Sequence, residues 1–152
     1  MKDPYLLPNS LVLKNKLNIT DRDELNKAES AISKAKLFTA EEVKGDFDYN
    51  HLMALHKHIL GDIYDWAGQP RLIDMQKSEP VLSGMSVKYG HYKQIPNEIE
   101  EAINQLKNAN LRNLDSYEQK AEAFSKGFAK LWQVHPFREG NGRTMREFLR
   151  QF

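Results

Sequence analysis

Apolar residues recur every three or four positions over most of the chain, which predicts amphipathic helices, because residues at this spacing share one face. Helices are predicted over residues 21–37, from the break at 45–48 to about Trp66, from Pro96 onward, and, longest of all, from Asp115 onward. The residues of these stripes are Leu25, Ala28, Ile32 and Ala35; Leu52, Leu55, Ile59 and Ile63; Ile99, Ala102, Ile103 and Leu106; and Tyr117, Ala121, Phe124, Phe128 and Leu131.

Polar residues and turn signals mark the ends of these helices and the segments between them. Thr20 is expected to cap the first helix, and Asp115 with Glu118 to cap the longest one. Residues 1–19 contain two prolines and are expected to form an irregular arm whose leucines dock on the core. Residues 71–87, with a possible strand at 71–75, are interpreted as an exposed β-hairpin. The predicted fold class is therefore all-α with one small hairpin.

Length and composition limit the classes of protein to consider. The 152 residues fit one domain, 1–152, and 22 basic against 21 acidic residues give a formal charge of +1. A nucleic-acid partner is disfavoured because such proteins usually carry a strong basic excess. The chain has no cysteine, so disulfides and thiolate chemistry are excluded. The sequence shows neither a signal peptide nor a membrane-spanning run, so no membrane partner and a cytoplasmic location are predicted.

The chemistry-bearing groups concentrate in one segment, residues 135–146, which reads HPFREGNGRTMR. The stripe of the longest helix, extended by one step, arrives at His135. A histidine in such a place is, by itself, more often a satisfied core residue. Pro136, however, disfavours a helical conformation for the residue before it, so the chain is expected to turn and hold the imidazole at the edge of a cleft. Phe137 is expected to anchor this turn in the core.

The second half of this segment has the composition of an anion-binding turn. Gly140, Asn141 and Gly142 precede a further predicted helix, and N–H groups at a helix start attract anions. Arg143 and Arg146 lie in its first turns, where the helix dipole disfavours cations, which suits a polyphosphate ligand. A glycine turn that caps an ordinary amphipathic helix would show similar features. On such a helix, Arg150 would be solvated surface.

Glu139 completes the predicted site. A carboxylate beside bound phosphates repels them unless a cation lies between, and Mg²⁺ is commonly held by one or two carboxylates with substrate phosphates. Without a metal, Glu139 would be a surface residue near a turn. Together the segment supplies a base, a metal ligand, an oxyanion cradle and two cations, the groups needed for attack on a nucleotide phosphate.

At these positions the sequence resembles the Fic family, whose signature is His-x-Phe-x-(Asp/Glu)-Gly-Asn-Gly-Arg-x-x-Arg. Every specified position is matched, and the segments 3–5, 13–17 and 61–68 also resemble family segments in order. The resemblance implies an all-α Fic fold with a β-hairpin called the flap. It also implies transfer of AMP from ATP to a Ser, Thr or Tyr hydroxyl of a target protein.

The resemblance also implies a role for each matched residue. His135 would take the proton of the hydroxyl, and Glu139 would hold Mg²⁺ across the α- and β-phosphates. Gly140, Asn141 and Gly142 would form the anion hole, and Arg143 and Arg146 would neutralise the β- and γ-phosphates. The flap, placed at residues 71–87, would align the target by strand pairing through Arg71, Leu72, Ile73 and Asp74.

Regulation and the nature of the transferred group stay open. The inhibitory motif (Ser/Thr)-x-x-x-Glu-(Gly/Asn) is not matched, because Leu25 follows Glu24, whereas the Asp-Pro-Tyr start resembles family members controlled by a separate antitoxin-like protein. The chain is expected to be truncated relative to the family, whose domains continue past the motif, and delivery into a host cytosol as an effector is a second possible location. The alternatives are transfer of UMP or phosphocholine, or a catalytically idle nucleotide-binding module, which an intact His135 argues against.

The remaining histidines are not predicted to form a metal site. His56 and His58 point about 200° apart on a helix and are interpreted as partly exposed residues. His51 and His58 share a face but lie two turns apart, too far for one ion. His91 is interpreted as a loop residue, and the alternative is contact with nucleotide or target.

Overall fold

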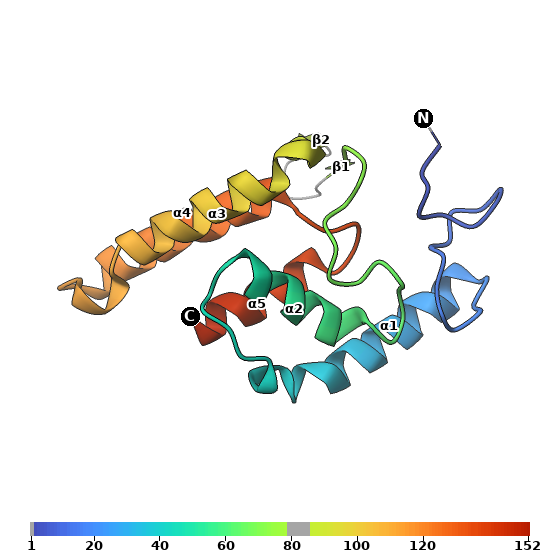
Figure 1. The fold of residues 1–152 in the computed structure, drawn as a ribbon, viewed down its shortest axis with the longest axis horizontal. Helices are drawn as coiled ribbons and strands as arrows, with labels where there is room; N and C mark the ends of the chain where they lie inside the picture. The colour runs from blue at the N-terminus through green and yellow to red at the C-terminus, as the bar shows by residue number, and fades with distance from the viewer. Residues whose placement is uncertain (1, 79–85) are drawn as a thin grey trace. The chain divides into compact units, whose positions relative to one another are not determined.

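The structure, a computed structural model, describes residues 2–78 and 86–152 (Figure 1). The chain divides into two compact units. The first comprises Met1–Gln69 and Arg138–Phe152, and the second comprises Pro70–Phe137. Each unit is built mainly from helices, and the only strands of the described residues belong to the second unit. The expected class, mostly helical with one two-stranded hairpin, is confirmed.

The first unit contains α1 (Arg22–Leu37), α2 (Tyr49–Leu60) and α5 (Asn141–Gln151). Helix α2 contacts both α1 and α5 and buries more apolar side chains than either of them. Its core cluster is Val12, Leu25, Ile59, Leu60, Ile63, Tyr64 and Ala67. Leu13, Leu17 and Ile19 pack against this cluster, which confirms a docked, irregular N-terminal arm. Leu11 is 74% exposed, so the expectation that it docks on the core is wrong. No helix described in either unit is long and apolar enough to cross a membrane.

Acidic residues cap the first two helices. The carboxylate of Asp21, and not the predicted Thr20, accepts from the N–H of Glu24 at 2.8 Å, so that prediction is wrong by one residue. Asp48 accepts from the N–H of His51 at 2.8 Å at the start of α2. Helix α2 ends at Leu60, and tight turns continue to Gly68, whereas the sequence predicted helix to about Trp66.

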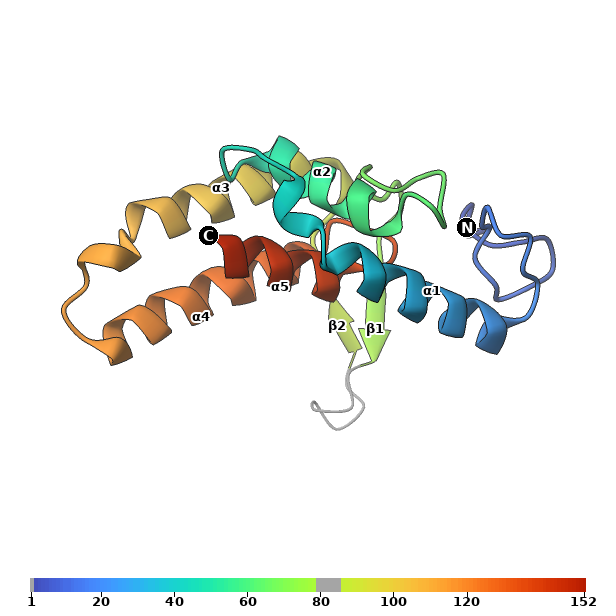
Figure 2. The same ribbon diagram turned by 90° about the horizontal axis from the view of Figure 1, so that it is seen from below.

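The second unit contains the hairpin and two long helices. Strand β1 (Gln76–Ser78) pairs antiparallel with β2 (Ser86–Lys88), with Lys77 opposite Val87. Helices α3 (Ile95–Asn108) and α4 (Tyr117–Val134) pack side by side (Figure 2). The strand predicted at 71–75 is wrong, because β1 begins only at Gln76 and residues 71–75 are irregular. Residues 79–85 of the hairpin predicted at 71–87 fall outside the described residues.

Helix α4 differs from its prediction at its N-terminal half. Ser116 caps it by accepting from the N–H of Gln119 at 3.1 Å, so the predicted pair Asp115 and Glu118 is displaced by one position. Tyr117 is 82% exposed and Phe124 38% exposed, so neither belongs to a buried stripe. The residues that α4 buries are Gly127, Leu131 and Val134.

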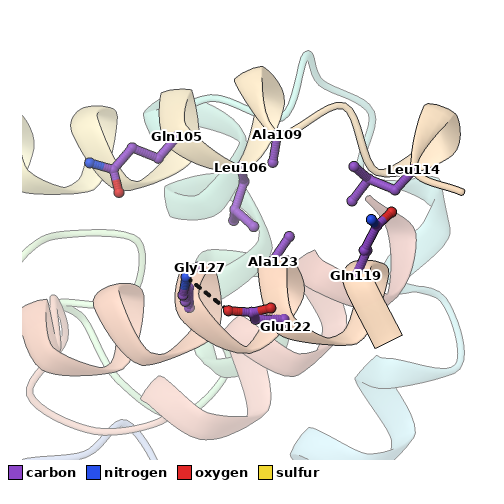
Figure 3. Close-up of a pocket in the computed structure, with 9 residues that line it drawn as sticks. Gln105, Leu106, Ala109, Leu114, Gln119, Glu122, Ala123 and Gly127 are labelled. Carbon is purple, nitrogen blue, oxygen red and sulfur yellow. Dashed lines mark ion pairs between the residues drawn. The ribbon is translucent and has the colours of Figure 1, made fainter. Parts of the chain in front are cut away.

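Gly127 lets the two long helices approach each other closely. A Cβ at this position would overlap the side chain of Leu106 on α3, so glycine is required for this packing. Toward the α3–α4 connection the helices leave a groove of about 470 Å³ lined by Leu106, Ala109, Leu114 and Ala123, with polar side chains at its rim (Figure 3).

Candidate active site

The segment 135–146 passes from one unit to the other. Phe137 is the last residue of the second unit, and Arg138 is the first residue with which the chain returns to the first unit. His135 and Phe137 belong to the second unit. Glu139, the glycine turn, Arg143 and Arg146 belong to the first. Phe137 is fully buried, as its predicted role as an anchor requires.

His135 ends α4 in a left-handed backbone conformation. Its φ is 49°, and its N–H donates to the carbonyl of Leu131 at 3.2 Å. This confirms the expected end of the helix at His135. Only 2% of the residue is exposed, so the imidazole is buried and not at the edge of a cleft as the sequence predicted. The imidazole stacks on the ring of Tyr89, with centroids 3.8 Å apart and planes 5° apart, and Trp132 meets it edge-on at 5.2 Å.

The surroundings of His135 keep its ring neutral. Burial lowers the pKa of His135 to about 3, and the positive charges of Lys77 and Arg71 act in the same direction, whereas the backbone of Trp132 opposes them. Over the described residues neither ring nitrogen has a hydrogen-bond partner of normal geometry. A neutral imidazole with an unengaged nitrogen is the form that can accept a proton from a substrate.

The glycine turn forms the start of α5. Gly140 is its N-cap, with a φ of 81°, and a Cβ there would overlap the side chain of Leu60. Both constraints require glycine at this position. Asn141 and Gly142 follow as the first residues of the helix, where backbone N–H groups have no intrahelical acceptor. Half-buried Glu139 precedes the turn, and its Oε1 accepts from the N–H of Gly140 at 3.2 Å.

His56, on α2, fixes the backbone next to this turn by hydrogen bonds. Gly68 donates its N–H to Nδ1 of His56 at 2.8 Å, so Nδ1 is an acceptor and the ring proton lies on Nε2. Nε2 then donates to the carbonyl of Glu139 at 2.9 Å. Burial and, to a smaller extent, nearby Arg143 lower the pKa of His56 to about 4, against the effect of the Glu139 hydrogen bond, which raises it. The prediction of a partly exposed His56 is wrong, because the residue is fully buried.

Arg143 is anchored to α1. One of its terminal nitrogens donates to Ser33 Oγ at 2.7 Å, and the other forms an ion pair with Glu29. The second oxygen of the Glu29 carboxylate accepts from the hydroxyl of buried Tyr64. Burial and this hydrogen bond raise the pKa of the Tyr64 hydroxyl. Glu29, Ser33 and Tyr64 did not emerge from the sequence, although Leu25, Glu29 and Ser33 follow one another at four-residue spacing on the buried face of α1.

A cavity of about 440 Å³ opens beside Arg143 and Glu139 within the first unit. The other residues that line it come from α1: Asn26, Glu29, Ser30, Ser33, Lys34 and Leu37. The cavity brings the side chains of Glu139 and Arg143 to the same space.

The two arginines of the motif are held differently. Arg146 is exposed, donates only to the carbonyl of Gly142 one turn back at 3.1 Å, and has no ion pair within the described residues. Its guanidinium is therefore available to an anion. Arg150 binds Glu147 at 2.8 Å and Glu41 at 2.7 Å, so it is a paired surface residue.

Two of the residues predicted to dock the target, Arg71 and Asp74, make hydrogen bonds within the protein. Arg71 is buried, and its guanidinium donates to backbone carbonyls. Asp74 accepts from the N–H of Tyr92 at 2.9 Å and lies 3.6 Å from the ring of His91, which caps a short 3-10 helix. Leu72 is 66% exposed. Because Arg71 is enclosed, it cannot meet a target directly. Docking along the hairpin stays a prediction.

A sequence model described as the Fic/DOC family matches residues 46–152. This chain belongs to the Fic/DOC family. It is 38% identical to protein adenylyltransferase VbhT of Bartonella schoenbuchensis over 98% of its own length and 30% of the relative's. It is 37% identical to probable protein adenylyltransferase y4lH of Sinorhizobium fredii, over 98% of this chain and 74% of that relative. The chain thus spans less than a third of VbhT.

Solved structures of Fic domains share the fold. The N-terminal Fic domain of a putative cell filamentation protein from Bartonella quintana, solved with bound ADP, superposes with a TM-score of 0.79 at 25% identity. The match covers 95% of this chain and 72% of that one. The signature residues of this Fic/DOC chain therefore lie in a fold that solved Fic domains share.

Glu139 of this Fic/DOC chain fits one kind of metal site. Over residues 2–78 and 86–152, no three histidines and carboxylates gather to hold an ion by themselves. The other carboxylate at the cavity, Glu29, is ion-paired with Arg143, so half-buried Glu139 suits an ion that takes its other ligands from water and phosphates, as Mg²⁺ does.

Proposed function

We propose that this Fic/DOC domain transfers AMP from ATP to a Ser, Thr or Tyr hydroxyl of a target protein. The observation that carries the proposal is the neutral imidazole of His135, held at the end of α4 and only four residues before Glu139 and the glycine turn. Two relatives named as protein adenylyltransferases, each 37% or more identical, support the same activity. A module that only binds nucleotide has no need of this base.

In the proposed reaction His135 accepts the proton of the target hydroxyl. The oxygen attacks the α-phosphorus of ATP, a new P–O bond forms, and the bond to the β-phosphate oxygen breaks, so pyrophosphate leaves. Backbone N–H groups of Gly140, Asn141 and Gly142 bind the phosphate oxygens at the start of α5. Arg143, fixed by α1, and the exposed Arg146 neutralise the β- and γ-phosphates.

Glu139 would hold Mg²⁺ against the α- and β-phosphates. The ion supplies positive charge where the leaving pyrophosphate gains negative charge. The backbone of Glu139 is fixed by His56, so its carboxylate starts from a defined position. The metal is thus expected to be required for transfer.

The flap and a regulatory partner complete the proposal. Target backbone would pair with the edge of the hairpin at β1, beside the exposed Leu72, which selects an extended segment and not a fixed sequence. A small antitoxin-like protein would restrain the domain. A chain that is silent toward ATP while free of any bound protein would contradict this last point. The site of action is expected to be the cytoplasm or a host cytosol.

The test is transfer of label from α-labelled ATP to proteins of a cell lysate in the presence of Mg²⁺. The wild type is compared with His135→Asn, which tolerates the left-handed backbone, and with Arg146→Ala. Label is expected only with the wild type. Equal labelling by His135→Asn would overturn the role of the base. Preference for labelled UTP would favour UMP transfer, and ATP binding without any transfer would favour an idle binding module.

A further inference from the structure

We propose that Arg71 is a positioning residue that fixes the imidazole of His135 by joining the end of α4 to the base of the hairpin. The inference rests on the proposed function, because it concerns the residue assigned there as the base. It goes beyond the family signature, in which Arg71 has no part.

Arg71 gathers the backbone around His135. Its Nε donates to the carbonyl of His135 at 2.7 Å, and Nη2 donates to the carbonyl of Val134 at 3.0 Å. Its own main-chain N–H donates to the carbonyl of Pro136 at 2.8 Å. Three consecutive carbonyls are thus bound by one residue, of which only 1% is exposed.

The end of α4 needs such a partner. The last carbonyls of a helix have no intrahelical donor and carry the negative end of the helix dipole. His135 also holds a φ of 49°, which costs a residue other than glycine about 1–2 kcal/mol, so the turn relaxes unless its surroundings enforce it. A guanidinium meets the need because its planar donors reach several carbonyls at fixed angles, whereas a lysine ammonium acts as a point charge.

The same guanidinium holds the residue next to Tyr89. Nη2 also donates to the carbonyl of Gly90, whose N–H donates to the carbonyl of Gln133 at 3.0 Å. Nη1 donates to the carbonyl of Ile73 at 2.6 Å, in the irregular segment that leads into β1. Tyr89 is therefore pinned between Gly90 and β2, and its ring lies parallel to that of His135.

These contacts determine where the imidazole points. The bonds from Arg71 to the carbonyls of residues 134–136 fix the backbone that carries the His135 side chain. The bond from Arg71 to Gly90 fixes the neighbouring Tyr89, whose ring covers one face of the imidazole. A ring stacked at 3.8 Å cannot rotate out of its plane without moving its neighbour, so the edge with its nitrogens faces one direction. The charged groups that act on the imidazole are Lys77, from β1, and Arg71 itself.

The experiment separates positioning from a purely structural role. We compare Arg71→Lys, Arg71→Gln and Tyr89→Leu with the wild type and with Arg112→Gln, an exposed arginine of the same unit. Two kinds of measurement are made on folded protein. The transfer assay gives kcat and KM for ATP, and NMR gives the side-chain ¹⁵N signals of His135 as a function of pH.

Arg71→Lys is expected to lower kcat at least tenfold with KM for ATP within about twofold, and to shift the His135 nitrogen signals. Arg71→Gln also removes a positive charge and should raise the pKa of His135. Tyr89→Leu, which leaves the donors and acceptors of the Arg71 hydrogen bonds described above unchanged, should shift the same signals, and Arg112→Gln should change nothing. Folded Arg71 variants with wild-type kcat, or with lower kcat but unshifted His135 signals, would overturn the proposal.

Should the Arg71 variants not fold, Tyr89→Leu decides, and unchanged His135 signals in it would equally overturn the proposal. A wild type that transfers no AMP would instead overturn the proposed function, while the NMR signals would still test the link from Arg71 to the ring.

Discussion

The stability of this protein is expected to fall steeply in mild acid because of His56. The ring is fully buried, accepts from Gly68 and donates to Glu139, and both contacts use the neutral form. Protonation at Nδ1 would place two N–H groups against each other. Lowering the pH from 7.5 to 5 is therefore a direct perturbation of the turn that precedes α5.

The size of the effect follows from the two pKa values. His56 titrates at about 4 in the folded chain and at 6.5 when unfolded, so the unfolded chain binds more protons between these values. The stabilisation is complete above about pH 6.5 and is lost as the pH falls toward 4, at about 1.4 kcal/mol per pH unit. At pH 5 the loss from His56 is about 2 kcal/mol. His135 has a shift of the same sign and adds a similar loss.

The assay is urea unfolding followed by circular dichroism at pH 7.5 and at pH 5. The comparison is with His56→Gln, which keeps hydrogen-bonding groups but cannot titrate. His56→Gln starts less stable at pH 7.5, because at least one buried hydrogen bond is impaired. Its further loss between pH 7.5 and 5 should be about 2 kcal/mol smaller than that of the wild type.

Subtracting the two pH dependences removes every titration that the two proteins share. Parallel curves for wild type and His56→Gln would refute the buried, neutral bridge between Gly68 and Glu139. A wild type that gains stability in acid would refute even the sign of the argument.

Three further results are expected. Glu29→Gln leaves Arg143 without its counter-charge and should lower the free energy of unfolding, measured in urea, by about 1–3 kcal/mol. The control Tyr64→Phe should lower it by about 1 kcal/mol. A change near zero for Glu29→Gln would contradict the anchoring of Arg143 by Glu29. Gly140→Ala should cost at least about 1–2 kcal/mol and weaken ATP binding in calorimetry, because of its positive φ and the overlap with Leu60; unchanged affinity would count against the turn as the phosphate site. Chelation of Mg²⁺ should stop transfer and added Mg²⁺ restore it, whereas transfer that survives chelation would refute the metal requirement.

Periodicity predicted the helices because each buries one continuous face. Helix α3 shows this most clearly, since its predicted stripe residues Ile99, Ala102, Ile103 and Leu106 are all buried. The ends of the helices were less predictable. At both Thr20-Asp21 and Asp115-Ser116 two neighbouring residues could cap, and only the path of the arriving chain decides between them.

The stripe of α4 shows where periodicity fails. Phe124 and Phe128 suggested that the core follows the large aromatic residues, whereas α3 meets α4 at Gly127, where the absence of a side chain allows close approach. Hydrophobic periodicity counts only large apolar residues, so it does not identify a glycine as the point of contact between two helices. Phe124 is instead 38% exposed.

The supporting polar residues were the hardest part of the site to predict. The motif itself is local, so adjacency in sequence was enough to find it. His56 and Glu29 act on it from 83 and 114 positions away, through a backbone carbonyl and a guanidinium. Their sequence signal was present, since each lies on the apolar face of its helix. A polar residue on such a face needs a partner, which the sequence does not name.

The left-handed backbone of His135 bears on any effort to make this protein more robust. Asparagine and glycine adopt that conformation more readily than histidine, so a library screened only for heat resistance is expected to enrich them at position 135. Selection for durability would then remove the group proposed to accept the proton. A screen meant to keep an active protein must score turnover in every round.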